Sequence, residues 1–389
     1  MQHTMSDPLG LRAEFPITES WNYLNCAAIA PLSHAARNAG IAFMDERMYE
    51  PWPDPAPMGL IRLRQRKDRV RTAFAKLIGA QPGEIGLVES TSAGENIVAR
   101  ALDLKPGDEI VVDALHFESS YLLYRQLEQS HGIVLRVVAH KEGMIDPEDI
   151  AAVCGQRTRL VSLSWVSNRN GFRHDVAQIT AIAHAHGAYC YVDAIQAVGT
   201  FVIDVAAADI DFLACGSYKW LYANFGVSFL YVKNSLLERI PSDRFGHTHV
   251  ASATEDLQFT VKSDASKYEY AAIAHTSVAQ LEGALSLFER VGIATIERHG
   301  LALAQRLWTG LEAAGCDMFT PPQTQSAIVS IYTHEHTAAL EAALKQHKIA
   351  ALFRENNTSL RLGCAMFNTE EEIDVCVAAV RNAIMNYEL

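Results

Sequence analysis

The chain has 389 residues, of which 49% are hydrophobic and 20% are charged, and its formal net charge is −12 at pH 7. This composition is typical of a globular protein and excludes a disordered or collagen-like chain. The acidic balance argues against nucleic acid as the main partner, because phosphate backbones are bound by an excess of Lys and Arg. No apolar run approaches the roughly 20 residues that a bilayer span requires, so we expect no membrane partner.

The N-terminus and the cysteines both point to the cytoplasm. The first ten residues, MQHTMSDPLG, lack the basic and apolar stretches of a secretory signal. The seven cysteines form no C-x-x-C pair and mostly lie in apolar segments, which indicates buried thiols in a reducing compartment. We therefore expect a cytoplasmic protein.

From about residue 84 to 233, short apolar runs alternate with longer stretches of helical periodicity. This pattern predicts seven strands: Ile85–Glu89, Glu109–Asp113, Val134–Ala139, Leu160–Trp165, Ala188–Asp193, Phe212–Cys215 and Val227–Val232. Helices lie between them, such as Asp175–His186, which begins at an Asp cap and ends before Gly187. The alternation predicts an α/β fold with a mainly parallel sheet and helices on both faces.

After about residue 280 the pattern changes to that of a smaller α+β domain. The predicted helices are Val278–Arg290, Thr295–Ala314, Thr337–His347 and Glu370–Met385, and the predicted strands are Ala327–Tyr332 and Ser359–Leu362. We expect an N-terminal segment (residues 1–30) that joins the small domain, a large α/β domain (31–280) and the small C-terminal domain (281–389).

Polar residues follow two of the predicted strands. Asp193 ends the apolar run AYCYV, and Lys219 follows the next strand along the chain. Open α/β sheets bind ligands at the carboxyl ends of their strands. A buried lysine is costly unless its charge is shifted or used. Taken alone, such a pair is more often a surface lysine and a strand-end cap than a catalytic pair.

Three longer motifs change this interpretation: VSLSWVSNRNG, YVDAIQAVG and GSYKWLYANFGVSFLYV. In this order and spacing they resemble the pyridoxal-phosphate (PLP) enzymes of aminotransferase class V, a group that includes cysteine desulfurases, isopenicillin N epimerase-like proteins and kynureninase. The similarity extends from about Tyr23 to Asn386. It implies the fold type I of PLP-dependent transferases, with a seven-stranded sheet, and a homodimer with active sites at the subunit interface.

The resemblance assigns roles around the cofactor ring. Lys219 matches the lysine that binds PLP as a Schiff base and later moves protons at the substrate carbons. Asp193 matches the carboxylate that keeps the pyridine nitrogen protonated. Asn168 and Gln196 match residues that hydrogen-bond the phenolic oxygen of the ring.

The phosphate of PLP needs hydroxyls, backbone N–H groups and a helix N-terminus. Ser90, Thr91 and Ser92 open a predicted helix and resemble the family's phosphate-binding segment. Ser217 and Tyr218, next to the lysine, are further candidates.

The segment LHFESSYLLY can be aligned with the family in two registers. One places His116 on the residue that stacks on the cofactor, and the other places Phe117 there. Ser119, Ser120 and Tyr124 fit the second register better, so we favour Phe117. The difference matters because a histidine can assist proton transfer and a phenylalanine cannot.

The C-terminal segment ALFRENNTSLRLGCAMFNTEEEI resembles the part of the family that binds the substrate carboxylate. A guanidinium binds a carboxylate bidentately, and the match assigns this role to Arg354. We expect Arg361, in a predicted strand, to be structural. In the N-terminal segment, Asn25 and Ala28 are predicted to contact the substrate.

The segment also departs from the desulfurases. Residues 355–360 read ENNTSL and lack the nucleophilic cysteine that desulfurases carry there, and Cys364 is expected to be structural. Persulfide formation on the enzyme is therefore not expected. Three H-x-H pairs are present, at residues 184/186, 247/249 and 334/336. The first lies on a predicted helix, where i and i+2 side chains diverge, and the other two lack acidic or Cys partners at usable spacing, so no metal site is expected.

These observations predict a PLP enzyme that acts on a small amino acid through an external aldimine and a quinonoid intermediate. Transamination is the first expectation, because Lys219 alone can perform both proton transfers. A β-elimination lyase (selenocysteine or cysteine lyase-like, without a catalytic Cys) or an epimerase would use the same residues, although an epimerase needs a second acid or base opposite the lysine. A PLP-binding regulatory module is the non-enzymatic alternative, and the intact pair of Lys219 and Asp193 argues against it.

Overall fold

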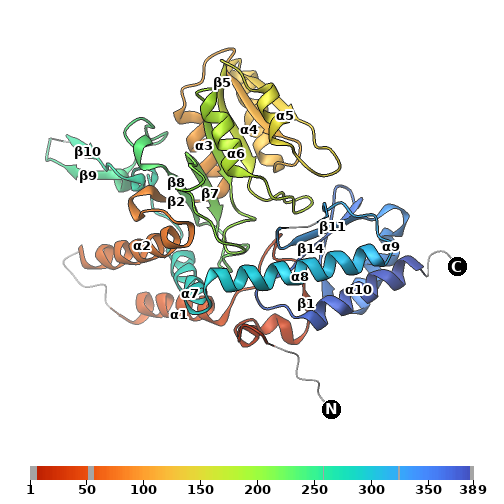
Figure 1. Cartoon of the computed structure of the whole chain (residues 1–389). Helices are drawn as coiled ribbons and strands as arrows, with labels where there is room; N and C mark the ends of the chain where they lie inside the picture. The colour runs from red at the N-terminus through yellow and green to blue at the C-terminus, as the bar shows by residue number, and fades with distance from the viewer. Residues whose placement is uncertain (1–6, 51–56, 257, 323–324, 386–389) are drawn as a thin grey trace.

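The computed structural model describes residues 7–50, 57–256, 258–322 and 325–385. Its centre is a seven-stranded sheet with the strand order β2-β8-β7-β6-β5-β3-β4 (Figure 1). The strands are β2 (Ile85–Val88), β3 (Glu109–Asp113), β4 (Val134–Val138), β5 (Thr158–Ser164), β6 (Tyr189–Asp193), β7 (Phe212–Gly216) and β8 (Ser228–Val232). β8 runs antiparallel to both of its neighbours, and the other pairings are parallel. The predicted mainly parallel sheet is confirmed.

Alternate residues of each strand enter different hydrophobic cores, as the two-residue period of a strand requires. On β6, Cys190 and Val192 belong to one core and Tyr191 belongs to the other. The first core is covered by α2 (Pro57–Ile78), α5 (Pro147–Val153), α6 (Val176–Ala185) and α7 (His275–Val291). The second is covered by α3 (Thr91–Ala101) and α4 (Glu118–His131). Helices therefore cover both faces, as predicted.

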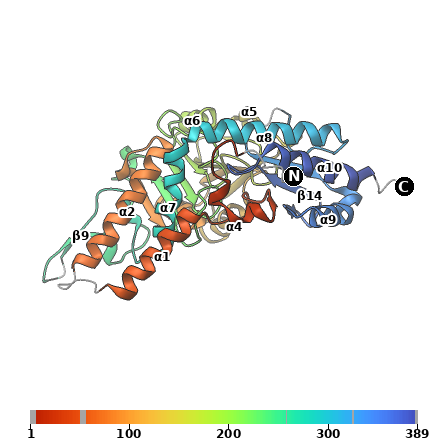
Figure 2. The same ribbon diagram turned by 90° about the horizontal axis from the view of Figure 1, so that it is seen from below.

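The C-terminal part of the chain, which was predicted to be a small domain and is given that name below, contains an antiparallel sheet. Its strands follow the order β11-β14-β13, which are Ile328–Tyr332, Ser359–Gly363 and Leu352–Arg354. The helices α8 (Ile293–Ala313), α9 (Thr337–Gln346) and α10 (Glu370–Met385) enclose a separate core with this sheet (Figures 1 and 2). The strands and helices named in the sequence analysis are present within about three residues of their predicted ends.

Several elements have no counterpart in the sequence prediction. The largest are α1 (His34–Tyr49) and α2, whose many charged residues obscure an apolar pattern and which pack against α7. A hairpin of β9 (Val250–Ala253) and β10 (Phe259–Val261) lies at the same end of the molecule as α1 and α2 (Figure 2).

The N-terminal segment joins the two parts of the molecule. β1 (Asn22–Tyr23) pairs in parallel with β12 (Ile349–Ala350) of the small domain. A few residues later, the N–H of Ala30 donates to the carbonyl of Tyr218 in the large domain, at 3.0 Å. The predicted boundary between residues 280 and 281 falls within α7. Residues 1–6 of the predicted N-terminal segment and 386–389 of the predicted C-terminal domain lie outside the described residues. The three-part division stays a prediction.

Gly199 packs closely against the main chain of Trp220, the residue after Lys219, and a substitution can test this contact. Gly199 has φ +91°, and a Cβ atom there would lie 2.4 Å from the carbonyl oxygen of Trp220. Gly315 has φ +82° and open space around it. Both alanine variants strain the backbone, but only Gly199→Ala also forces atoms together. We expect Gly199→Ala to lower the free energy of unfolding by about 3 kcal/mol and Gly315→Ala by about 1 kcal/mol. Urea unfolding measures both, and equal losses would contradict the close contact.

Candidate active site

The predicted site residues gather at one edge of the large sheet. Thr91 follows β2, Phe117 follows β3, Asn168 follows β5, Asp193 ends β6 and Lys219 follows β7. The carboxyl ends of parallel strands share an edge, which is where open α/β sheets hold their ligands.

Lys219 is buried, with 7% of its surface exposed. Its Nζ forms no hydrogen bond or ion pair within the described part of the chain, and it lies 5.8 Å from the ring centroids of both Phe117 and Tyr218. Burial and the positive charge of Arg361 lower the pKa of Lys219 to about 8, against the opposing effect of Asp193. The amine is thus neutral far more readily than an exposed lysine.

Asp193 is a buried carboxyl whose charge influences this amine without forming an ion pair with it. Its Oδ1 accepts a hydrogen bond from the N–H of Ile195 at 3.0 Å. Burial raises the pKa of Asp193, and the charge of Lys219 lowers it. The strand period places Asp193 on the same sheet face as Tyr191, which is the face covered by α3 and α4.

The sequence analysis missed a second buried carboxyl on this face. Glu95 of α3 accepts hydrogen bonds from the hydroxyls of Ser120, Tyr124 and Ser162, at 2.8, 2.8 and 3.2 Å. Burial, with a contribution from the charge of Asp193, raises the pKa of Glu95 to about 7. The available signal was the alternation of serines within the apolar run LVSLSW, which aims two hydroxyls at one face.

The structure distinguishes the two registers at residues 116 and 117. The imidazole of His116 is buried between Ser162 and Ser164, at 2.9 and 3.0 Å from their hydroxyls. Burial lowers its pKa to about 4, so it is neutral. The ring of Phe117 faces Lys219 instead. This geometry agrees with the preference for Phe117, whose stacking on the cofactor stays a prediction.

The five predicted phosphate ligands differ in their hydrogen bonds. The hydroxyl of Thr91 is buried without a partner. The side chain of Ser90 caps α3 by accepting from the N–H of Ala93 at 3.0 Å, and Ser92 lies 3.3 Å from the hydroxyl of Ser119. The first N–H groups of a helix have no intrahelical partners, so Thr91 and the start of α3 together form an anion site.

Ser217 and Tyr218, the two phosphate candidates next to Lys219, both make contacts within the protein. The hydroxyl of Ser217 lies within hydrogen-bond distance of the carbonyls of Asn224 and Val227, at 2.6 and 2.8 Å. Tyr218 stacks on Phe225, with 4.4 Å between ring centroids. Ser217 is therefore a weaker phosphate candidate than Thr91.

Two amides were predicted to bind the phenolic oxygen. Gln196 donates from Nε2 to the carbonyl of Ala27 at 2.9 Å and accepts at Oε1 from Trp220 at 2.7 Å. Asn168 has a buried Oδ1 without a partner. Gln196 thus ties the N-terminal segment to the residue next to Lys219, and Asn168 retains an unused polar atom.

The predicted N-terminal contacts lie where this segment crosses the site. Asn25 forms a parallel bridge with Gly363 at the end of β14, and its Oδ1 is buried without a partner. Ala28 is half-buried, one residue after the carbonyl that holds Gln196.

Three guanidiniums surround the substrate side. Arg354 pairs with Glu118 at 2.6 Å, and Arg169 pairs with Glu355. Arg361 donates to the carbonyl of Asn168 at 2.6 Å, its Nε has no partner, and it forms no ion pair with a carboxylate of the described residues. Burial and the charge of Arg354 lower its pKa to about 9. Arg361, which was expected to be structural, is the one of these three cations still without a counterion.

None of the seven cysteines has the character of a nucleophile. All are unpaired and at least half-buried, and burial raises the pKa of every one of them. Cys215 on β7 belongs to the core opposite the face of Asp193. A thiolate is required for nucleophilic attack, so no cysteine is poised for it here.

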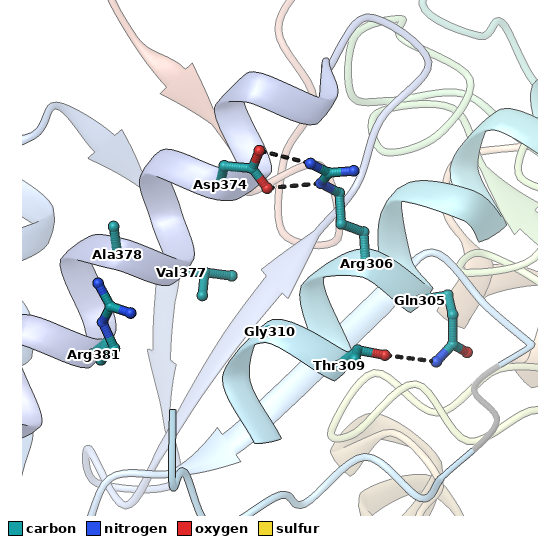
Figure 3. A pocket seen from close by; sticks show the side chains of 8 residues that line it. All are labelled: Gln305, Arg306, Thr309, Gly310, Asp374, Val377, Ala378 and Arg381. Atoms are coloured by element: carbon teal, nitrogen blue, oxygen red, sulfur yellow. Dashed lines mark hydrogen bonds and ion pairs between the residues drawn. The ribbon is translucent and has the colours of Figure 1, made fainter. Parts of the chain in front are cut away.

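A groove of about 550 Å³ between α8 and α10 contains none of these residues (Figure 3). Arg306 on its wall is already paired with Asp374 and Glu370. The unpartnered polar atoms at the strand ends locate the chemistry better than this surface hollow does.

Comparison with known proteins identifies the class. Residues 61–376 match the sequence model of the aminotransferase class-V family, and the chain belongs to this family. A probable cysteine desulfurase of Methanothermobacter thermautotrophicus is 27% identical over 385 residues, which cover 94% of this chain and 95% of the relative. A cysteine desulfurase of Dickeya dadantii is 28% identical over 330 residues, 80% of each chain.

Solved structures agree with the fold. The cysteine desulfurase CsdA of Escherichia coli superimposes with a TM-score of 0.86 at 25% identity, covering 98% of this chain and 99% of CsdA. C-DES, solved with glycine covalently linked to its PLP cofactor, superimposes with a TM-score of 0.87 at 22% identity, covering 95% and 99%. The chain has the fold of PLP-dependent desulfurases and is itself a PLP-dependent enzyme.

The residues present fit this cofactor. The anion site at Thr91 suits a phosphate, the buried carboxylate of Asp193 suits a protonated pyridine nitrogen, and the free amine of Lys219 suits an aldehyde. Among the described residues there is no cluster of His, Cys, Asp or Glu suited to a metal ion, and no helix has the length and apolar character to cross a bilayer.

The buried Glu95 predicts a dependence of stability on pH. Its folded pKa of about 7 exceeds the ordinary value of 4.5, so its contribution to stability is complete below about pH 4.5 and is lost as the pH rises through 7. Glu95→Gln is neutral throughout. Between about pH 4.5 and 7.5, we expect the free energy of unfolding to shift in favour of the variant by about 3 kcal/mol. Urea unfolding in one cofactor state measures this, and a constant difference would contradict the raised pKa.

Proposed function

We propose that this chain is a PLP-dependent lyase that breaks the Cβ–S bond of a sulfur-containing amino acid without a nucleophilic cysteine of its own. The named relatives are cysteine desulfurases, which supports a sulfur amino acid as substrate. The observation that carries the proposal is the combination of the candidate cofactor residues around Lys219 with seven thiols whose pKa is raised by burial. A β-elimination needs the amine and no thiol.

Bound PLP would withdraw electrons from the substrate Cα, which makes its proton removable. The neutral amine of Lys219 accepts that proton, and its lowered pKa of about 8 suits a base working near neutral pH. The Cβ–S bond then breaks with its electron pair leaving on sulfur. The released aminoacrylate hydrolyses to pyruvate and ammonia.

Asp193 supports this step as the buried negative charge that stabilises a protonated ring nitrogen. The ring of Phe117 faces Lys219. The neutral imidazole of His116 is held between the hydroxyls of Ser162 and Ser164. Neither supplies a second proton carrier, which counts against an epimerase. Transamination needs the same residues and is an alternative outcome of the test.

For the substrate carboxylate, we propose Arg361 and Arg354 as a joint anion site. Arg354 was the sequence-based choice, but Glu118 already neutralises it at 2.6 Å. Arg361 is deeply buried and has no carboxylate partner among the described residues. It also lowers the pKa of Lys219 more than Arg354 does. It therefore makes the larger contribution to binding.

We also propose a cytoplasmic homodimer. Exposed apolar side chains gather on α1 and on the β9–β10 hairpin, which lie at one end of the molecule (Figure 2). They are Met44, Met48, Tyr49, Phe259 and Val261. Large exposed apolar side chains favour association when they lie together, and a second copy of the chain is the partner that the family resemblance implies. Seven unpaired cysteines suit a reducing compartment.

Product analysis tests the proposed reaction. PLP-loaded enzyme incubated with cysteine, cystine or S-methylcysteine should release pyruvate, ammonia and a sulfur product in equal amounts. Lys219→Ala should abolish turnover and the borohydride-fixed cofactor, and Cys364→Ala should remain active. A keto acid formed only with an added acceptor would establish transamination instead, and a D-amino acid would establish epimerisation. Loss of activity in folded, PLP-loaded Cys364→Ala would restore a thiol mechanism.

Lysine variants test the anion site. A lysine keeps the charge but loses the two-point fork. We expect Arg361→Lys to weaken binding of S-methylcysteine about 10-fold or more, and Arg354→Lys to weaken it less. Spectral titration should also show that wild type prefers the amino acid to its carboxamide and that Arg361→Lys loses this preference. If only Arg354→Lys weakens binding, then Arg361 is structural.

A further inference from the structure

A chain of buried hydrogen bonds ends at the main chain of Phe117. The N–H of Phe117 donates to Nδ1 of His116 at 2.8 Å. On its other side, the imidazole lies 2.9 Å from the hydroxyl of Ser162, which donates to Oε1 of Glu95 at 3.2 Å. His116, Ser162 and Glu95 come from three different parts of the large domain, and each is at least 97% buried.

The contacts fix the tautomer of His116. Because Nδ1 accepts from a backbone N–H, it carries no proton, and the single proton of the neutral ring is on Nε2. The hydroxyl of Ser164, 3.0 Å from Nδ1, then donates to this nitrogen as well. Nε2 then donates to Ser162, whose own proton is free for Glu95. Every donor in the Glu95–Ser162–His116 chain thus has one acceptor, which makes the arrangement directional.

The far end of the chain is also fixed. Tyr124 and Ser120 donate to the two carboxyl oxygens of Glu95, at 2.8 Å each. Both residues lie on α4, the helix for which Phe117 is the N-cap. The side chain of Phe117 is only partly buried. The hydrogen bonds from Glu95 through Ser162 and His116 fix the backbone of Phe117, and the carboxyl of Glu95 also fixes α4, the helix that begins after it.

We propose that His116 and Glu95 are positioning residues that fix the backbone of Phe117, and thereby the ring that lies over Lys219. This inference rests on the proposed placement of Phe117 over the cofactor. The functional consequence is cofactor retention, because a ring held in place stacks on a planar partner without first losing conformational freedom.

A double-mutant cycle tests the proposal with the PLP dissociation constant as its readout, measured by titrating the apoenzyme. We expect Phe117→Ala to raise this constant about 5-fold and His116→Ala to raise it by a similar factor. If His116 acts through Phe117, the double variant should bind PLP no more weakly than Phe117→Ala alone. Ser162→Ala, which breaks the chain and keeps the imidazole, should show the same dependence on Phe117.

Two variants separate positioning from general stability. His116→Asn places an oxygen near the position of Nδ1 and should largely restore PLP binding. His174→Asn is the matched control, because His174 is equally buried, lies 3.4 Å from Asp113 and makes no hydrogen bond to Phe117. It should lower thermal stability and leave the PLP dissociation constant unchanged.

Multiplying effects in the double variant, or an unchanged constant in His116→Ala when Phe117→Ala raises it, would overturn the positioning role. An unchanged constant in Phe117→Ala would overturn the placement of Phe117 and this inference with it. The proposed lyase reaction is measured separately, by its products, and stands or falls independently of all three results.

Discussion

The site depends on the burial of one amine. Lys219 is buried at the end of β7, where the charges of Arg361 and Arg354 lower its pKa and the charge of Asp193 acts against them. An excess of buried positive charge is unfavourable unless an anion arrives. Under the proposed function, the phosphate of PLP and the carboxylate of a substrate would be such anions, and the charge that destabilises the site without them would favour their binding. The lowered pKa of Lys219 and the unpaired Arg361 follow from this single constraint.

The position of that amine is fixed by contacts from distant parts of the chain. Trp220, the next residue, donates to Gln196, which donates in turn to the N-terminal segment at Ala27. The same segment pairs with β12, and the two strands that follow β12 carry Arg354 and Arg361. The N-terminal segment therefore links the proposed cofactor residues around Lys219 to the part of the chain that carries the proposed substrate arginines. The hydrogen bonds of this segment to both parts of the molecule make the link.

The proposed lyase would share its fold and its cofactor with desulfurases and would differ from them in the chemistry of its reaction. The match to the family and the superposition on CsdA cover nearly the whole chain. The segment between Arg354 and Arg361 contains no cysteine, and burial raises the pKa of all seven thiols of the chain. The residues that we propose for removing a proton and for holding a carboxylate are present, and the proposed elimination requires no more than these.

The sequence by itself determined the local elements and the residues that follow them. Apolar runs of strand length placed all seven strands, and caps such as Asp175 placed helix ends, because these signals depend on neighbouring residues. Motif order was enough to select Lys219 and Asp193. Tertiary structure alone decided that Phe117 rather than His116 faces the lysine, that Glu95 lies behind Asp193, and that Arg354 has a counterion while Arg361 has none. Each of these depends on atoms brought together from segments tens or hundreds of residues apart, and no short-range pattern records which of two polar groups will find a partner.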